Sequence, residues 1–390
     1  MNIFIATRSP FPIGTSTAAR ISSYAKGFIS NGVNCTVITT CQKKSKNISN
    51  KIPYIQIFTP KTELTNLIFK SIYGLIGTVL CFRYLYKNLR RGDILILYGD
   101  NFFDNISFSF LKLFREIILV KELCEIPYMN NQVLNRIKRI VDTNLFYKTF
   151  DCFLVISENL SVYANKHKST KASIIKVPIL FDFDRLDVKE NIKDTSDIYI
   201  YHAGGLTEYK DGILTSIEAF GIAFKDIEKS VKFVIAGVNR WKLPDDFNKI
   251  VSKYHLKDNI VFLDFLKPEE VIQWSLKSDI SIIYKNDNVQ NRNGFATKVA
   301  EALGCNTAVI TTDVGETVNY LIDGFSGYIM KPQGPQILSQ KIIRAINNDD
   351  ERNKIIKNGK KVAQEHFDIS SQTNKIISVF NNKLKNLINE

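Results

Sequence analysis

The sequence alternates short apolar runs with stretches of helical spacing, and this alternation restricts the fold more than any other feature. In the first half, helical stretches such as 16–30 and 132–147 separate five apolar runs. The runs are NIFIA, NCTVITT, DILILY, REIILVKEL and DCFLVIS. Continuously apolar strands joined by helices are typical of a parallel sheet that helices cover on both faces.

A second series follows the polar, linker-like stretch VPILFDFDRLDVKENIKDTSD, which begins at Val177. Its runs are DIYIYHAGG, KFVIAG, NIVFLDFL, DISIIY, NTAVITT and SGYIM. We therefore predict an α/β fold of two doubly wound, Rossmann-like domains, residues 1–180 and 194–368. An amphipathic helix, 370–390, is predicted to dock back onto the first domain. Such sheets bind ligands beyond the carboxyl ends of their strands, so the expected site is the cleft where the two domains face each other.

Charge is distributed unevenly between the halves. The net charge is +13, and residues 1–190 carry 26 Lys and Arg against 14 Asp and Glu, an excess of 12. This half is expected to meet an anionic surface, either a membrane or nucleic acid, or to be only a solubilising basic face.

No segment predicts export or membrane crossing. The start, MNIFIATRSPFP, lacks the basic and apolar regions of a signal peptide. The uncharged core 71–82 is shorter than the roughly 20 residues that a spanning helix needs. The six cysteines have no metal-ligand spacing and are interpreted as reduced thiols. We expect a cytoplasmic protein, soluble or peripheral on the inner face of the cell membrane.

The segment PFPIGTSTAAR joins the first predicted strand to its helix. Gly14 would let a ligand approach the backbone, and Thr15 stands where the helix starts. Helix N-termini attract anions, so both residues are candidates for binding an anionic ligand. The alternative is an ordinary strand-to-helix turn.

The segment YHAGGLTEYKDGI places two glycines after a strand and a lysine at the mouth of a helix. Gly204 and Gly205 would leave room for a diphosphate, and Lys210 would neutralise it. The alternative is a tight turn with a solvated lysine.

The segment NGFATKVAEALG predicts a helix that starts with free N–H groups at Gly294, Phe295, Ala296 and Thr297, beside Lys298. Thr297 and Glu301 would share a face, where a carboxylate can accept hydrogen bonds from a ribose diol. The alternative is a capped helix with solvated charges. We discount the DFD at 182–184 as a metal site because it lies in the linker, and we interpret His202 as structural.

These segments resemble a retaining glycosyltransferase of the GT-B fold, in the large family 4 group. The resemblance extends over nearly the whole chain and includes VISENL, VPILFDFD, FVIAG, IVFLDFL and YLIDGFSGYIMKP. The family has two glutamates separated by seven residues; Glu301 matches the second, and Asn293 replaces the first. Lys210 matches the lysine of its diphosphate-binding pair, whereas Gly205 stands at the arginine position. The TK pair before Glu301 is similar to that of capsule and O-antigen enzymes.

The resemblance implies that the second domain binds a UDP or GDP sugar as co-substrate, without a further cofactor or a metal. Glu301 would hold the ribose, Lys210 and the helix N-terminus the diphosphate, and Asn293 a sugar hydroxyl. The first domain has no match to the family's histidine near the sugar, but Glu122 and Glu125 lie close to its place, and Glu122 is the catalytic candidate there. The expected acceptor is a lipid-linked saccharide or an oligosaccharide, with the segment 70–91 against an anionic inner membrane and no nucleic acid partner.

Two other readings remain open at this point. One is a sugar-nucleotide epimerase or hydrolase on a similar scaffold, for which Glu122, Glu125 and His202 would have to supply the acid and the base. The other is a degenerate member of the family that binds a nucleotide sugar or a partner without turnover, which the departures at Asn293 and Gly205 motivate.

Overall fold

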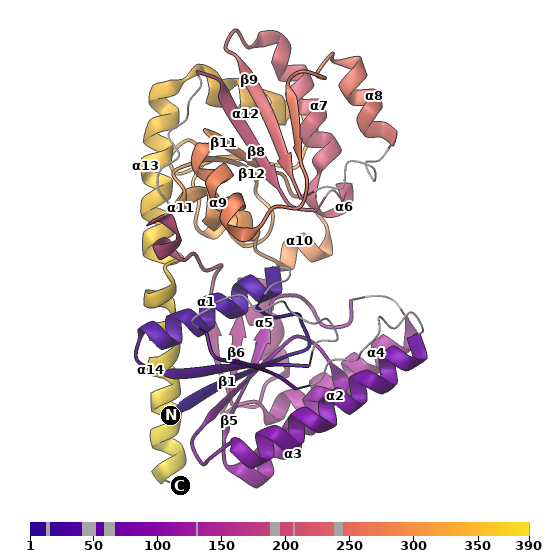
Figure 1. Ribbon diagram of the computed structural model, residues 1–390, viewed down its shortest axis with the longest axis vertical. Helices are drawn as coiled ribbons and strands as arrows, with labels where there is room; N and C mark the ends of the chain where they lie inside the picture. The colour runs from indigo at the N-terminus through magenta and orange to yellow at the C-terminus, as the bar shows by residue number, and fades with distance from the viewer. Residues whose placement is uncertain are drawn as a thin grey trace. The chain divides into compact units, whose positions relative to one another are not determined.

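The computed structural model describes residues 1–12, 16–40, 52–57, 67–129, 132–187, 196–205, 207–237 and 245–389 (Figure 1). The chain divides into two compact units. Unit 1 comprises Met1–Leu180 and Ile369–Glu390, and unit 2 comprises Phe181–Asp368. Among the described residues, no helix has both the length and the apolar character that crossing a membrane requires.

Unit 1 contains a parallel sheet with the strand order β3-β2-β1-β4-β5-β6-β7. The strands are β1 (Asn2–Thr7), β2 (Asn34–Thr39), β3 (Tyr54–Gln56), β4 (Ile94–Tyr98), β5 (Ile118–Leu123), β6 (Cys152–Val155) and β7 (Ser173–Lys176). Strands β4, β5 and β6 are almost wholly buried, as a sheet covered on both faces requires. The edge strands β3 and β7 are only half-buried, and the sequence prediction missed both.

Helices surround this sheet and include the C-terminal end of the chain. They are α1 (Ser16–Ser30), α2 (Leu67–Asn88), α3 (Phe102–Arg115), α4 (Val133–Val141), α5 (Glu158–His167) and α14 (Ile369–Asn389), with the π-helical turn η1 (Asp142–Phe146) and the 3-10 turn η2 (Tyr147–Thr149). Helix α14 packs along α1, and a Cβ on Gly27 would lie 2.5 Å from the side chains of Ile369 and Thr373. Glycine at position 27 therefore permits the close approach of the two helices.

Unit 2 has a parallel sheet in the order β10-β9-β8-β11-β12-β13. Its strands are β8 (Ile198–Ala203), β9 (Val231–Ala236), β10 (Ile260–Leu263), β11 (Ile280–Ile283), β12 (Ala308–Thr312) and β13 (Tyr328–Met330). The helices are α6 (Glu208–Asp211), α7 (Ile213–Ala223), α8 (Asp245–Lys253), α9 (Pro268–Lys277), α10 (Val289–Asn293), α11 (Thr297–Gly304), α12 (Pro335–Asn347) and α13 (Asp349–His366), with 3-10 turns η3 (Phe183–Asp187), η4 (Phe224–Asp226) and η6 (Gly315–Asn319). The predicted fold of two doubly wound α/β domains is confirmed.

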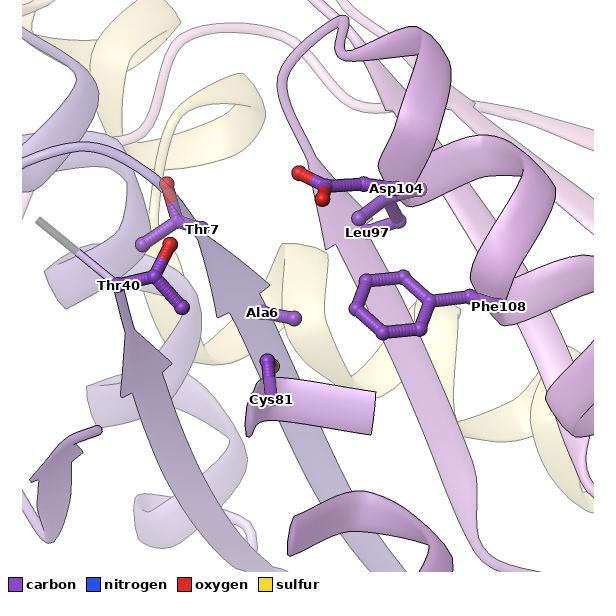
Figure 2. Close-up of a pocket in the computed structure, with 7 residues that line it drawn as sticks. All are labelled: Ala6, Thr7, Thr40, Cys81, Leu97, Asp104 and Phe108. Carbon is purple, nitrogen blue, oxygen red and sulfur yellow. The ribbon is translucent and has the colours of Figure 1, made fainter. Parts of the chain in front are cut away.

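A small cavity in unit 1 lies between the ends of β1 and β4 and the helices α2 and α3 (Figure 2). Its volume is about 10 Å³, and its lining includes Thr7, Thr40, Cys81, Asp104 and Phe108. This space holds roughly one water molecule, so the cavity is far too small for a sugar or a nucleotide.

Candidate functional site

The two glycines after β8 form a turn with an open backbone surface. Gly204 has a φ of +157°, and Gly205 is exposed. The turn after β9 approaches so closely that a Cβ on Gly237 would lie 2.8 Å from the carbonyl oxygen of Gly204. The turn follows the carboxyl end of β8, the edge at which open α/β sheets bind ligands. A large group can therefore approach the main chain here without meeting a side chain of the glycines.

Helix α6 follows this turn and carries Lys210, whose side chain is exposed. The helix ends at Gly212, which has a φ of +54°, in the left-handed region. A Cβ at Gly212 would also collide with the ring of Tyr284. Both the backbone angle and the contact with Tyr284 thus require glycine where α6 turns into α7.

Three asparagine side chains hold α6, two from the loop after β11 and one from α10. Each donates its side-chain amide to the carbonyl of one of three consecutive residues. Asn286 donates to Glu208, Asn288 to Tyr209 at 2.6 Å and Asn291 to Lys210 at 3.0 Å. The carbonyl of Glu208 also accepts from the N–H of Gly212 at 3.2 Å, but the last carbonyls of so short a helix have no partner within it. The segment 286–291 therefore fixes the backbone that bears Lys210.

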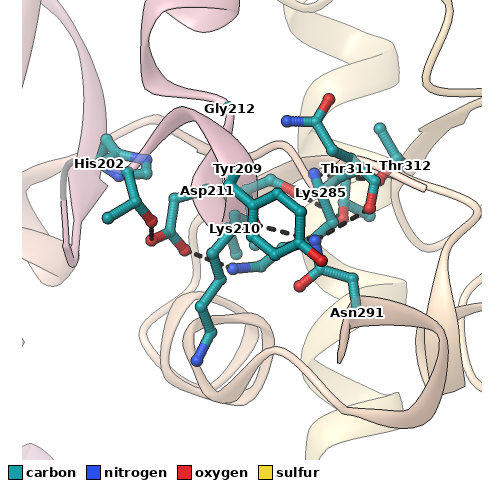
Figure 3. Close-up of polar contacts among 12 residues, drawn as sticks. His202, Tyr209, Lys210, Asp211, Gly212, Lys285, Asn291, Thr311 and Thr312 are labelled. Atoms are coloured by element: carbon teal, nitrogen blue, oxygen red, sulfur yellow. Dashed lines mark hydrogen bonds and ion pairs between the residues drawn. The ribbon is translucent and has the colours of Figure 1, made fainter. Parts of the chain in front are cut away.

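An ion pair ties the end of α6 to the same loop. Nζ of Lys285 lies 2.5 Å from Oδ1 of Asp211, and these side chains are only 16% and 14% exposed. The hydroxyl of Thr312 holds the Lys285 backbone, accepting from its N–H at 3.1 Å and donating to its carbonyl at 2.8 Å. Burial lowers the pKa of Lys285, and the nearby charge of Lys210 contributes. Figure 3 shows the pair, with the Lys210 side chain directed away from it.

His202 lies one residue before the end of β8, and its ring is buried. Nδ1 is 3.1 Å from the carbonyl of Ile282, which can only accept, so Nδ1 carries the proton. Nε2 has no hydrogen-bond partner among the described residues. Burial lowers the pKa of His202, and the charges of Asp211, Lys285 and Lys298 act on the ring from three segments. The structural interpretation of His202 accounts for Nδ1 only, because Nε2 is an acceptor for which the described part of the chain supplies no donor.

The predicted helix in NGFATKVAEALG is α11, which begins at Thr297 and has no side-chain cap at Ala296. Lys298 and Glu301 form an ion pair of 2.6 Å and are 32% and 21% exposed. The Phe295 ring is buried and stacks on Tyr320 with centroids 5.2 Å apart, so only the backbone of Phe295 is available to a ligand. Asn293 ends α10 and donates its amide to the carbonyl of Val289 at 2.7 Å.

Gly294 is fixed by the segment that follows β12. Its carbonyl accepts from the N–H of Glu316 at 3.2 Å. A Cβ on Gly315, which has a φ of +71°, would lie 2.6 Å from that same carbonyl. The bend between α10 and α11 is therefore held in place by the glycine of the TTDVGE segment.

The catalytic role expected for Glu122 is not supported by its surroundings. Glu122 belongs to β5, and its carboxylate accepts from Nε of Arg20 at 2.7 Å, with side chains 1% and 5% exposed. Tyr24 also donates to it, at 3.1 Å, and Arg20 donates to the carbonyls of Val177 and Pro178. The charge of Glu122 is thus used inside unit 1, where it positions a buried arginine. Gly14 and Thr15 lie outside the described residues.

The sequence analysis did not predict Lys285 and the three asparagines as site residues. They come from the segment YKNDNVQN after β11. A polar run directly after a buried strand was the available signal, because strand ends of one parallel sheet meet at a common edge. Nothing in the sequence shows that these side chains reach α6, which lies more than 70 residues earlier.

Comparisons with known proteins agree with this fold. Residues 182–362 match the family model described as Glycosyl transferases group 1. An uncharacterized glycosyltransferase of Methanocaldococcus jannaschii is 22% identical over 76% of this chain and 77% of its own length. The capsular polysaccharide biosynthesis glycosyltransferase CapM of Staphylococcus aureus is 30% identical, over 28% of this chain and 30% of its own. Anabaena HepE in complex with UDP and glucose superimposes with a TM-score of 0.73 and 15% identity, over 98% of this chain and 100% of that one. The structural likeness shows the GT-B fold.

Proposed function

We propose that this glycosyltransferase, whose unit 2 contains a glycosyl transferases group 1 domain, transfers a sugar from a nucleoside diphosphate sugar to a lipid-linked saccharide with retention. It would belong to family 4 and act in the synthesis of a bacterial surface polysaccharide. The observation that carries the proposal is the open glycine turn after β8 and the nearby Lys210. Three asparagine side-chain amides fix the backbone of the helix that bears this lysine. UDP is the first nucleotide to test, since HepE binds it.

The donor's diphosphate lies over Gly204 and Gly205 in this proposal. Lys210 and the free N–H groups at the start of α11 neutralise its charge, which is the work that a metal ion performs in other transferases. Glu301 accepts hydrogen bonds from the ribose diol, and its ion pair with Lys298 orients that carboxylate. The side-chain amide of Asn293 takes a sugar hydroxyl in place of the family's glutamate.

In the transfer step, the bond between the anomeric carbon and the diphosphate oxygen breaks, and the acceptor oxygen bonds to the carbon on the same face. The acceptor hydroxyl gives its proton to a phosphate oxygen of the leaving diphosphate, so no nucleophile from the protein is consumed. Positive charge and N–H groups aimed at the diphosphate stabilise the charge that develops on it. Because Glu122 is buried in its pair with Arg20, we assign it no step of the chemistry.

We assign the contact with lipid to the apolar surface of unit 1, which consists of exposed residues of α2, α3 and α4. Helix α4 has no buried residue, and Val133, Leu134, Ile137 and Ile140 are 49–74% exposed. Rows at helical spacing on the other helices are also exposed: Ile72, Leu75, Ile76 and Val79 on α2, and Phe110, Leu113 and Phe114 on α3.

Basic residues accompany this surface. Helix α4 contains Arg136, Lys138 and Arg139 and no acidic residue. Helices α2 and α3 lie side by side (Figure 1). The surface continues from one to the other, since the rings of Tyr86 and Phe114 are 6.5 Å apart and Arg115 lies over Tyr86. Exposed apolar rows flanked by lysine and arginine suit the boundary of an anionic bilayer. A lipid-linked acceptor would be presented there, which makes a peripheral position at the inner face of the cell membrane part of the proposal.

A second candidate function is binding of a nucleotide sugar without turnover, which the replacements at Asn293 and Gly205 favour. Product formation separates the two. Purified protein is incubated with UDP and GDP sugars and a lipid-linked acceptor in excess EDTA, and the product's anomeric configuration is determined. The proposal expects an α-linked product from an α-linked donor, with turnover lost in Lys210→Met. Donor binding without product over the whole panel would favour the second candidate.

A further inference from the structure

The family's second diphosphate-binding cation is missing from the turn after β8, because Gly205 stands at that position. A Cβ on Gly205 would lie 3.5 Å from Oδ2 of Asp211. The other oxygen of the same carboxylate, Oδ1, is 2.5 Å from Nζ of Lys285. The ammonium group of Lys285, which follows a different strand, is therefore paired with the same carboxylate that borders the place where Gly205 has no side chain.

We propose that Lys285 is a donor-binding residue, which exchanges its ion pair with Asp211 for the diphosphate of the bound donor and replaces the cation missing at Gly205. The inference rests on the proposed function and adds a residue to the same site. It concerns the neighbourhood of Gly205, whereas the side chain of Lys210 is directed away from the pair of Lys285 and Asp211 (Figure 3).

The topology places Lys285 at the right edge of the sheet. It comes two residues after β11, which pairs in parallel with β8, so the carboxyl ends of both strands lie at one edge. The Thr312 hydroxyl fixes the Lys285 backbone on both sides, while the four methylenes of its side chain remain free to redirect Nζ over a few Å. The exchange therefore needs a side-chain rotation and no movement of the strand.

Charge balance favours the exchange when a diphosphate arrives. Burial lowers the pKa of Lys285 and so disfavours its charge, Asp211 opposes this shift, and the charge of Lys210 adds a repulsion on Lys285. An incoming dianion relieves this repulsion. Asp211 keeps a partner after the exchange, since the Thr207 hydroxyl lies 3.3 Å from its Oδ2. Nε2 of His202, an acceptor with no hydrogen-bond partner in the residues that the structure describes, lies beside Gly204, where a Cβ would be 3.9 Å away.

The competing account makes Lys285 only a tether that holds α6 in place. The two accounts predict opposite effects for the two partners. If Lys285 is a tether, removing either side chain breaks the same bond, and both variants weaken diphosphate binding alike. If Lys285 moves to the diphosphate, Asp211 competes with the ligand for it. Losing Lys285 then weakens binding, whereas neutralising Asp211 strengthens it.

The experiment measures the affinity for UDP, GDP and ADP by titration calorimetry with wild type, Lys285→Met, Asp211→Asn and Lys257→Met. Lys257 is an exposed lysine of unit 2 after α8 and serves as the matched control. We expect binding to weaken about tenfold to hundredfold in Lys285→Met, the worth of a charge-assisted hydrogen bond, and to tighten in Asp211→Asn. Thermal unfolding of each variant without ligand establishes that it is folded at the titration temperature.

Equal weakening in Lys285→Met and Asp211→Asn, or unchanged affinity in Lys285→Met, would overturn the assignment of Lys285 while the proposed function stands. Absence of nucleoside diphosphate binding in the wild type would overturn both. A loss of affinity in Lys285→Met supports the assignment only if Lys257→Met binds the diphosphate as tightly as the wild type does.

Discussion

The side-chain amide of Asn291 donates to the carbonyl of Lys210 at 3.0 Å, although 81 residues separate them in the sequence. The same amide donates to the carbonyl of Asn286 at 2.9 Å, and Asn291 is buried. One side chain thus fixes both the helix that bears the candidate diphosphate lysine and the loop that holds this helix.

Replacing Asn291 by alanine is expected to weaken UDP binding severalfold and to lower the stability of unit 2 by about 1–3 kcal/mol, because two part-buried carbonyls lose their donor. The charge of Lys210 is unchanged in this variant, so a loss of affinity reports on its positioning. Titration calorimetry and thermal unfolding measure the two effects. Asn248→Ala, an exposed asparagine of α8, is the control; equal affinities in both variants would remove Asn291 from the site.

Gly212→Ala is expected to destabilise unit 2 by more than the strain of a positive φ alone, because the new methyl group meets the ring of Tyr284. Gly32 in unit 1 is the comparison, since its φ is +75° and no atom lies within 4 Å of an added Cβ. Gly32→Ala should cost about 1 kcal/mol and Gly212→Ala about 2–4 kcal/mol. Both tryptophans fall in unit 2, so their fluorescence reports the urea unfolding of this unit in Gly212→Ala. Hydrogen exchange in β1 reports the stability of unit 1 in Gly32→Ala. Equal losses would show that the Tyr284 contact adds nothing.

Asp142 makes the stability of unit 1 depend on pH. Burial raises its pKa to about 6, although Lys121, Asn105 and Tyr128 favour the ionised form. The folded state then binds the proton more tightly than the unfolded state, for which the ordinary value is 3.8. This contribution is therefore complete below about pH 4 and is lost as the pH rises through about 6, on the order of 3 kcal/mol in all.

Asp142→Asn should remove this loss, because an asparagine oxygen can still accept from Asn105 and Tyr128. Hydrogen exchange in β5, measured between about pH 4 and 7 and corrected for the intrinsic rate, reports the stability of unit 1. We expect the variant to gain stability relative to wild type as the pH rises. Parallel curves for the two proteins would contradict the raised pKa.

The apolar surface of unit 1 predicts binding to anionic vesicles. Ile137→Asp, on the exposed face of α4, should reduce cosedimentation with phosphatidylglycerol vesicles severalfold, because it places a charge at the bilayer boundary. Val162→Asp on α5 is the control, since Val162 is 65% exposed and lies outside this surface. Binding of wild type to phosphatidylcholine vesicles should be weak, and salt should weaken binding to the anionic ones. Equal vesicle binding of both variants would exclude α4 from the membrane contact. If the wild type self-associates and Ile137→Asp does not, the exposed face of α4 instead binds a second copy of this chain.

The sequence was sufficient where the determining pattern is local. Continuous apolar runs predicted all six strands of unit 2, because a strand covered on both faces needs no polar residue. The edge strands β3 and β7 were missed because half-buried strands of three and four residues lack such a run. The start of α11 and the glycine turn after β8 were also predicted, because a few consecutive residues determine each of them.

The candidate site was less accessible because its partners come from distant segments. Glu122 was expected to be catalytic, but Arg20, 102 residues earlier, buries and neutralises it. Adjacent Lys121 points to the opposite face of the sheet and binds the carbonyl of Gly99 at 2.6 Å and Oδ1 of Asn105 at 3.0 Å. The sequence does not indicate the partners of Glu122 or of Lys121, because nothing near a charged residue in a parallel strand shows which distant residue it binds.

The measurement that most directly tests the account is calorimetric titration of wild type and Glu301→Ala with UDP, GDP and ADP. The account predicts that one diphosphate binds to wild type and that Glu301→Ala binds it at least about tenfold more weakly, because the ribose loses a charge-assisted hydrogen bond. Lys298 loses its partner in this variant, so Lys298→Met is titrated beside it and is expected to lose less. Absence of binding to wild type, or equal affinity in Glu301→Ala, would contradict the central claim that unit 2 holds the nucleotide through α11.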